Sequence, residues 1–115
     1  MDTITFEQMQ QYEHDENVLI IDVREPDEIK NTGLIGDSIN IPLSSLENAL
    51  KKMSEADFLR EYGKSKPEND SLVIFTCKLG GRATKAGDIA KELGLNKVGV
   101  YKGSWTEWSQ KLNLV

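Results

Sequence analysis

The residue in this sequence best suited to chemistry is Cys77, the only cysteine of the chain. A thiol is a weak nucleophile until it loses its proton, and nearby cations or the amino end of a helix favour the thiolate. The segment CKLGGR (77–82) offers both, because it contains Lys78 and Arg82 and leads into a predicted helix. Residues 71–87 include no acid, although the whole chain has a net charge of -5. This local reversal of charge predicts that a thiolate nucleophile and an anionic substrate share one small pocket.

Two glycines shape the backbone around this thiol. Gly80 and Gly81 can adopt positive φ angles, which allows successive N–H groups to converge on one point as an anion-binding nest. A plainer interpretation also fits the segment. A single cysteine after an apolar strand is often a small hydrophobic core residue, and two glycines can form no more than a tight strand-to-helix turn. The segment alone leaves both interpretations open.

The elements that must position the cysteine are strands alternating with helices. The segments VLIIDV (18–23) and SLVIFT (71–76) are nearly continuous apolar runs, typical of strands in a parallel sheet that is covered on both faces. Weaker strands are predicted at SINI (38–41) and KVGVY (97–101). We therefore expect an α/β fold with a mainly parallel central β-sheet and helices on both faces. Cys77 follows a central strand directly, at the carboxyl edge where sites form in such folds.

Capping residues predict where the helices begin and end. Thr5 and Gln8 have the spacing of a capping box, and Pro26 occupies a first helical turn, where proline is tolerated. Serine opens two further helical patterns, and Gly94 ends the helix that follows the cysteine segment. The predicted helices lie at 6–13, 25–31, 44–53, 54–63, 82–93 and 104–112.

Composition excludes several classes of protein. A chain of 115 residues with 38% hydrophobic and 29% charged residues is expected to form one globular domain. The negative net charge argues against a nucleic-acid or anionic-membrane partner, and the apolar runs are too short to span a membrane. One cysteine excludes an intramolecular disulfide and suits a reducing compartment, so we expect a cytoplasmic protein, or a mitochondrial one if a leader has been removed. His14 is the single histidine, so we expect neither a metal site nor a cofactor.

Four motifs, in order along the chain, resemble those of the rhodanese-like domain family. The cysteine segment matches its C-x-x-G-x-R loop, and three further stretches match D-V-R-x-x-x-E, the segment ending in I-N-I-P, and the closing G-G-W-x-x-W. The matching residues are Cys77, Gly80 and Arg82; Asp22, Val23, Arg24 and Glu28; Gly33, Ile35, Ile39, Asn40, Ile41 and Pro42; and Gly103, Trp105 and Trp108. The resemblance implies a single rhodanese-like domain over residues 1–115, with its core at about 5–112, and is greatest to short thiosulfate sulfurtransferases.

This resemblance implies a reaction in two halves. The Cys77 thiolate takes the outer (sulfane) sulfur from thiosulfate or a persulfide donor, and the resulting persulfide passes that sulfur to an acceptor, with ping-pong kinetics. The acceptor would be cyanide or a thiol such as glutathione or a thioredoxin-like protein. Lys78 is predicted to recognise the donor, Leu79 to help exclude water, and Arg82 to brace the loop. Gly80 and Gly81 supply the backbone cradle.

Residues outside the cysteine loop carry weaker expectations. Asp22 and Arg24 follow the neighbouring strand and are predicted either to line the rim of the pocket or, for Arg24, to pair with Glu28. Gly103 is expected to allow close approach to the cysteine loop, and the two tryptophans of the last motif to pack in the core. The family pattern has His and Pro where this chain has Leu34 and Gly36. This departure is expected to alter no more than one wall of the pocket.

Three alternative functions share part of this pattern. A persulfide carrier in a protein sulfur relay would keep the same loop but turn over thiosulfate feebly. A non-catalytic interaction module would keep the fold, although such modules typically lack the cysteine. A phosphatase would need one more residue between the cysteine and the arginine, whereas Cys77 to Arg82 spans six residues inclusive, the sulfurtransferase length. The pattern predicts nothing about the oligomeric state.

Overall fold

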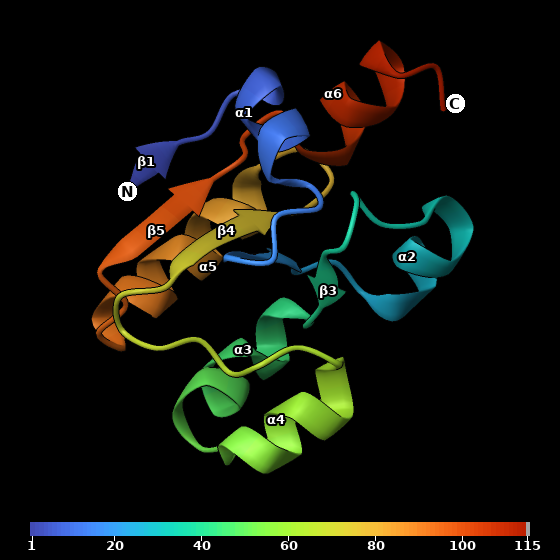
Figure 1. The fold of residues 1–115 in the computed structure, drawn as a ribbon. Coiled ribbons are helices and arrows are strands. Elements are labelled where there is room, and N and C mark those ends of the chain that lie inside the picture. Colours follow the sequence, from blue (N-terminus) through green and yellow to red (C-terminus); the bar gives the residue numbers. More distant parts are fainter. Residues whose placement is uncertain (115) are drawn as a thin grey trace.

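A computed structural model describes residues 1–114 and confirms the predicted α/β class. Five strands form one sheet in the order β1-β5-β4-β2-β3, and every neighbouring pair is parallel (Figure 1). The strands are β1 (Asp2–Thr3), β2 (Val18–Asp22), β3 (Ile39–Asn40), β4 (Leu72–Thr76) and β5 (Lys97–Val100). The cysteine thus follows β4, the central strand of the sheet.

The described residues form six helices, of which all but the second pack buried residues on a face of the sheet. They are α1 (Phe6–Tyr12), α2 (Pro26–Thr32), α3 (Leu43–Lys51), α4 (Glu55–Tyr62), α5 (Gly81–Glu92) and α6 (Ser104–Lys111). Buried residues of α3, α4 and α5 pack on one face, and those of α1 and α6 pack on the other. Figure 1 shows α1 and α6 beside each other above the sheet, and the rings of Phe6 and Trp108 join them at 5.3 Å between centroids. Trp105 and Trp108 are both buried in this second cluster, as predicted.

The two central strands explain why the sequence folds in this way. In β4, Val73 and Phe75 point into the cluster under α5, whereas Ile74 points into the cluster under α1 and α6. In β2, Ile20 and Ile21 divide between the two clusters in the same manner. A strand that is buried on both faces needs apolar residues at successive positions, which is the pattern that the sequence shows.

Most of the predicted boundaries hold, but one is wrong and one short strand was not predicted. Thr5 and Gln8 form the predicted capping box, and Ser54 caps α4. The predicted serine cap of the preceding helix is wrong, because α3 begins at Leu43 with Pro42 as its N-cap. The ring of Pro42 sets its φ at -52°, and the Leu43 N–H donates to a carbonyl that follows β2, so the helix can begin directly after β3. The two-residue β1 was not predicted, since it is too short to show a pattern. Within residues 1–114, no helix is long and apolar enough to cross a membrane.

Candidate active site

The cysteine lies at the carboxyl edge of the sheet, held between β4, α5 and the start of α6. The carbonyl of Cys77 accepts a hydrogen bond from the Trp105 N–H at 3.0 Å, and the carbonyl of Lys78 accepts one from the Thr106 N–H at 3.1 Å. These two bonds join the cysteine loop to the first turn of α6. The loop is also fixed at its two ends, because β4 precedes it and α5 follows it.

The Cys77 sulfur faces backbone donors at the amino end of α5. Its Sγ accepts hydrogen bonds from the Gly80 N–H at 3.0 Å and from the Ala83 N–H at 3.4 Å. The amino end of a helix carries partial positive charge, so this position stabilises a thiolate or another anion. The residue is only 1% exposed, yet its sulfur borders an open pocket. The cradle that the sequence predicts thus includes these two N–H groups.

Gly80 is required for this cradle by its conformation and by its surroundings. Its φ is +105°, in the left-handed region that residues with a side chain seldom adopt. A Cβ at this position would also lie 2.6 Å from the carbonyl oxygen of Lys102. At Gly103, which was predicted to allow close approach to the cysteine loop, the three atoms nearest to an added Cβ belong to Glu107. The close approach between the loop and the chain after β5 occurs at Gly80.

Arg82 ties the cysteine loop to α2. Its two terminal nitrogens donate to both carboxylate oxygens of Glu28, at 2.6 and 3.0 Å. The Arg82 guanidinium holds the pKa of Glu28 at about 2, well below its ordinary value of 4.5, and the same hydrogen bonds raise the pKa of Arg82. A bidentate pair of this kind fixes orientation as well as charge. Two of the five guanidinium N–H donors of Arg82 are thus used within the protein.

Asp22 and Arg24 form a buried ion pair with each other. The Nη2 and Nε of Arg24 donate to the carboxylate of Asp22 at 2.8 and 3.0 Å, and both residues are at most 1% exposed. The Arg24 guanidinium also lies 5.3 Å from the centre of the Trp105 ring. Neither residue lines the pocket beside Cys77, so their predicted place at its rim is not what the structure shows. The predicted Arg24–Glu28 pair is also wrong, because Arg24 is bonded to Asp22 and Glu28 to the loop arginine.

Sequence reasoning missed Ser104 as a contributor to the site. Its Oγ accepts a hydrogen bond from the Cys77 N–H at 3.1 Å, donates to the carbonyl of Tyr101 at 2.7 Å, and lies 3.8 Å from the Cys77 sulfur. Ser104 has a φ of +54°, which is strained for a residue with a side chain. The sequence feature that could have indicated Ser104 is a serine where the G-G-W pattern has its second glycine. Its hydroxyl bonds hold the strained conformation and position the cysteine backbone.

The pocket that reaches the sulfur is small and positively charged. It has a volume of about 370 Å³ and is lined by Cys77, Lys78, Leu79, Gly81, Arg82 and Lys85. Lys85 was not among the predicted site residues, although its helical spacing from Gly81 could have indicated it. Leu79 is 72% exposed. It can therefore fill its predicted role, the exclusion of water, only when a bound substrate lies against it.

A larger hollow lies elsewhere on the molecule. It has a volume of about 480 Å³ and is lined by residues 16–19 and by residues of the segment 59–71. Cys77, the one thiol of the chain, does not line it. Size alone would favour this hollow, but the smaller pocket contains the nucleophile, the N–H donors and the cations. Among residues 1–114, no group of three or more His, Cys, Asp or Glu side chains could hold a metal ion.

Comparison with known proteins identifies the family. The family model described as the rhodanese-like domain matches residues 5–111. The chain belongs to the rhodanese-like domain family. It is 47% identical over 110 residues to the Rhodanese domain-containing protein CG4456 of Drosophila melanogaster, a match that covers 96% of this chain and 98% of that protein. The family resemblance of the four sequence motifs is thereby confirmed.

Two further matches, one from the curated proteins and one from the solved structures, carry functional names. The Homo sapiens protein named Thiosulfate:glutathione sulfurtransferase is 37% identical over 93 residues, which are 80% of this chain and 79% of that protein. The structure of the human single-domain sulfurtransferase TSTD1 matches with a TM-score of 0.86 and 29% identity, covering 96% of this chain and 97% of that one. Two relatives from yeasts are mitochondrial by name.

Two departures from the rhodanese-like pattern, Leu34 and Gly36, lie outside the pocket. Neither Leu34 nor Gly36 is among its lining residues. Gly36 has a φ of +48°, and a Cβ there would lie 2.3 Å from the carbonyl oxygen of Glu13. Glycine at this position therefore serves the packing between two loops, and the expected change in a pocket wall is not found.

Proposed function

We propose that this rhodanese-like domain is a sulfurtransferase that moves sulfane sulfur from thiosulfate through a Cys77 persulfide to a thiol, with glutathione as the acceptor. The observation that carries the proposal is that Cys77 lines a cationic pocket and that two N–H groups at the start of α5 donate to its sulfur. The functional names of the similar human proteins support the reaction class and the two substrates.

The first half-reaction makes one sulfur–sulfur bond and breaks another. The Cys77 thiolate attacks the outer sulfur of thiosulfate, the bond between the two sulfurs of thiosulfate breaks, and its electron pair leaves with sulfite. The enzyme then carries a persulfide anion, so the total charge is unchanged and no oxidant is needed. The outer sulfur of the persulfide carries the negative charge that the N–H groups of Gly80 and Ala83 can stabilise.

Positive charge in the pocket offsets the repulsion between donor and nucleophile. Thiosulfate is a dianion, and two like unit charges about 4 Å apart repel by roughly 4 kcal/mol at the effective dielectric of a protein surface. Lys78 lines the pocket, is exposed, and has no carboxylate within 4 Å among the residues described. Arg82 is held by Glu28, so it contributes charge without changing partner. We therefore assign recognition of the donor to Lys78 and bracing of the loop to Arg82.

The second half-reaction returns the enzyme to its first state. A thiolate of the acceptor attacks the outer persulfide sulfur, the bond to Cys77 breaks, and Cys77 leaves as a thiolate with the electron pair. With glutathione the product is glutathione persulfide. Leu79, beside the sulfur, is placed to cover an acceptor once it is bound, which would exclude water from the reacting atoms.

The compartment and the physiological acceptor remain proposals. A cytoplasmic or a mitochondrial location is consistent with one free thiol, since both compartments are reducing. A thioredoxin-like protein is the alternative acceptor, and it would make the domain part of a protein sulfur relay. Rates with the two acceptors at physiological concentrations separate these cases, because a relay protein would transfer sulfur to the protein thiol far faster than to glutathione.

The test is the stoichiometry of sulfite release. Wild-type protein mixed with thiosulfate alone should release one sulfite per Cys77 and stop, and addition of glutathione should restart release as turnover. Cys77→Ser should release none under either condition, while its circular dichroism spectrum should match that of the wild type. Sulfite release by the serine variant, or none by the wild type, would contradict the proposal.

A further inference from the structure

Lys85 lies on the helix face that borders the reactive sulfur. It follows Gly81 by four residues in α5, so the two share one face and are about 6 Å apart along the axis. Helical side chains lean toward the amino end of their helix, which directs Lys85 toward the pocket that it lines together with Cys77. Gly81 has no side chain, and a Cβ built there would meet nothing within 4 Å. No Gly81 side chain therefore fills the pocket that Lys85 and Cys77 both line.

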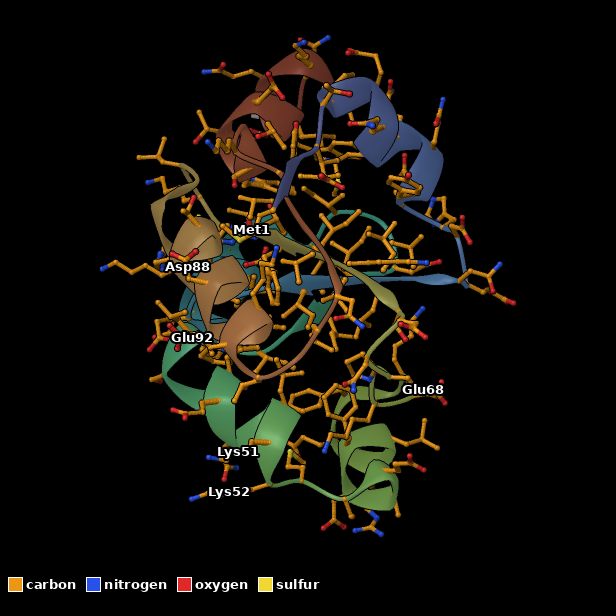
Figure 2. All side chains as sticks on the ribbon, turned by 90° about the vertical axis from the view of Figure 1, so that its left-hand side faces the viewer. Met1, Lys51, Lys52, Glu68, Asp88 and Glu92 are labelled. Atoms are coloured by element: carbon orange, nitrogen blue, oxygen red, sulfur yellow. The ribbon has the colours of Figure 1, made fainter. Side chains whose placement is uncertain are left out.

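The charge of Lys85 is not used within the described protein. Among residues 1–114, no carboxylate lies within 4 Å of its Nζ. The next acids along α5 are Asp88 and Glu92, which Figure 2 shows on the outer side of the helix. Arg82, the other α5 cation of the pocket, is paired with Glu28. Lys85 is thus an exposed cation of the pocket with no anionic partner among the described residues.

We propose that Lys85 is the specificity-determining residue for the acceptor, and that it binds a carboxylate of an acidic thiol during the second half-reaction. This inference rests on the proposed function. Thiosulfate is a small ion whose sulfur must meet Cys77 within the N–H cradle, so it has no part that extends a helical turn away to Lys85. Glutathione does, because its thiol stands between two carboxylate-bearing ends. Lys78 therefore recognises the sulfur donor, and Lys85 recognises the acceptor.

The step that Lys85 assists is the acceptor attack already described. The bound thiolate forms a bond to the outer persulfide sulfur, and the bond to Cys77 breaks. Lys85 takes no proton and gives none in this step. It raises the occupancy of the pocket by thiols that carry a carboxylate, and it leaves neutral thiols unaffected.

A single-turnover experiment separates this role from the loading step. Cys77 is first converted to the persulfide with thiosulfate, the donor is removed by desalting, and loss of the persulfide is followed by intact mass after mixing with each thiol. The thiols are glutathione and 2-mercaptoethanol, which has no carboxylate. The variants are Lys85→Gln, Lys85→Glu and Lys85→Arg, with Lys91→Gln as a control that removes an exposed lysine from the far end of the same helix.

The proposal predicts how each variant should transfer sulfur. Lys85→Gln should require about fivefold more glutathione for half-maximal transfer, since a surface ion pair has a modest effect, with the limiting rate unchanged. Lys85→Glu should lose more, and Lys85→Arg should retain transfer close to that of the wild type. Transfer to 2-mercaptoethanol should stay at the wild-type value, and persulfide loading from thiosulfate should fall by a smaller factor than transfer to glutathione, because Lys85 adds only its charge to donor binding. Lys91→Gln should match the wild type throughout.

Two results would overturn the proposal. One is an equal loss of transfer to both thiols, which would mark Lys85 as a residue that supports the loop rather than one that recognises a carboxylate. The other is unchanged transfer to glutathione in Lys85→Glu. If thiosulfate fails to load the wild type, the proposed function fails, but the acceptor step can still be measured on protein loaded with inorganic polysulfide. The two failures are therefore distinguishable.

Discussion

The substitution Gly80→Ala tests the cradle around the sulfur, because two separate costs meet at this residue. Its φ of +105° costs an alanine about 1–2 kcal/mol. The added Cβ would also lie 2.6 Å from the backbone oxygen of Lys102, and relief of such overpacking typically costs about 1–3 kcal/mol. We expect the free energy of unfolding to fall by about 2–5 kcal/mol, the sum of the two costs, against a typical domain stability of about 5–15 kcal/mol.

The same substitution should slow the chemistry. The Gly80 N–H is the nearer of the two backbone donors to the Cys77 sulfur, at 3.0 Å, and relief of the contact must move it. Loss of one preorganised donor commonly lowers a rate by about a hundredfold. The rate of persulfide formation from thiosulfate, followed by intact mass after acid quenching, should therefore drop by about that factor. Urea unfolding on the same sample measures the stability.

Gly63→Ala is the matched control for this prediction. Gly63 also has a positive φ, +75°, but a Cβ there would meet nothing within 4 Å, and the residue follows α4, away from the thiol pocket. This variant should lose about 1 kcal/mol of stability from backbone strain alone and keep the wild-type rate of persulfide formation. Equal stability losses in the two variants, together with an unchanged rate in Gly80→Ala, would refute the reasoning.

Three further substitutions test the residues around the loop. Glu28→Gln should remove a pH-dependent contribution to stability: the pKa of this carboxyl falls from 4.5 to about 2 on folding, so its stabilisation is complete above about pH 4.5 and is lost as the pH falls toward 2. Urea unfolding between pH 3 and 7 should show a flatter profile for this variant, and an unaltered profile would contradict the ion pair. Asp22→Asn should lower stability by about 3–5 kcal/mol, because it leaves the buried guanidinium of Arg24 without its counter-charge; a loss below about 1 kcal/mol in thermal unfolding would count against that burial. Ser104→Ala should cost about 1–3 kcal/mol, since the buried Cys77 N–H loses its acceptor; Ser104→Gly should lose less, because it relieves the strained φ, and the reverse order would contradict the geometry.

The sheet could be predicted from the sequence because its central strands are apolar at nearly every position. Continuous apolar runs such as 71–76 are compatible with a strand that is buried on both faces, and the helices between them follow from capping residues. The two-residue β1 and the start of α3 at Leu43 could not be predicted in this way. Each depends on hydrogen bonds to a distant strand, β5 for the first and the end of β2 for the second.

The site was predictable where the chemistry resides in adjacent residues and not where it depends on pairing across the fold. The loop around Cys77 is contiguous, so its thiol, glycines and cations could be recognised together. Arg24 and Glu28 are close in sequence and of opposite charge, which favoured a pair, but Glu28 binds a residue 54 positions away. Ser104 lies 27 positions from the cysteine and reaches it only because β5 is beside β4.

The most direct test of the central claim is the intact mass of the reduced protein after it is mixed with excess thiosulfate and desalted. The account predicts a gain of one sulfur atom, about 32 Da, on the wild type and no gain on Cys77→Ser. Addition of glutathione should return the mass of the wild type to its starting value. An unchanged wild-type mass at excess thiosulfate, or the same gain on the serine variant, would contradict the claim that Cys77 carries the transferred sulfur.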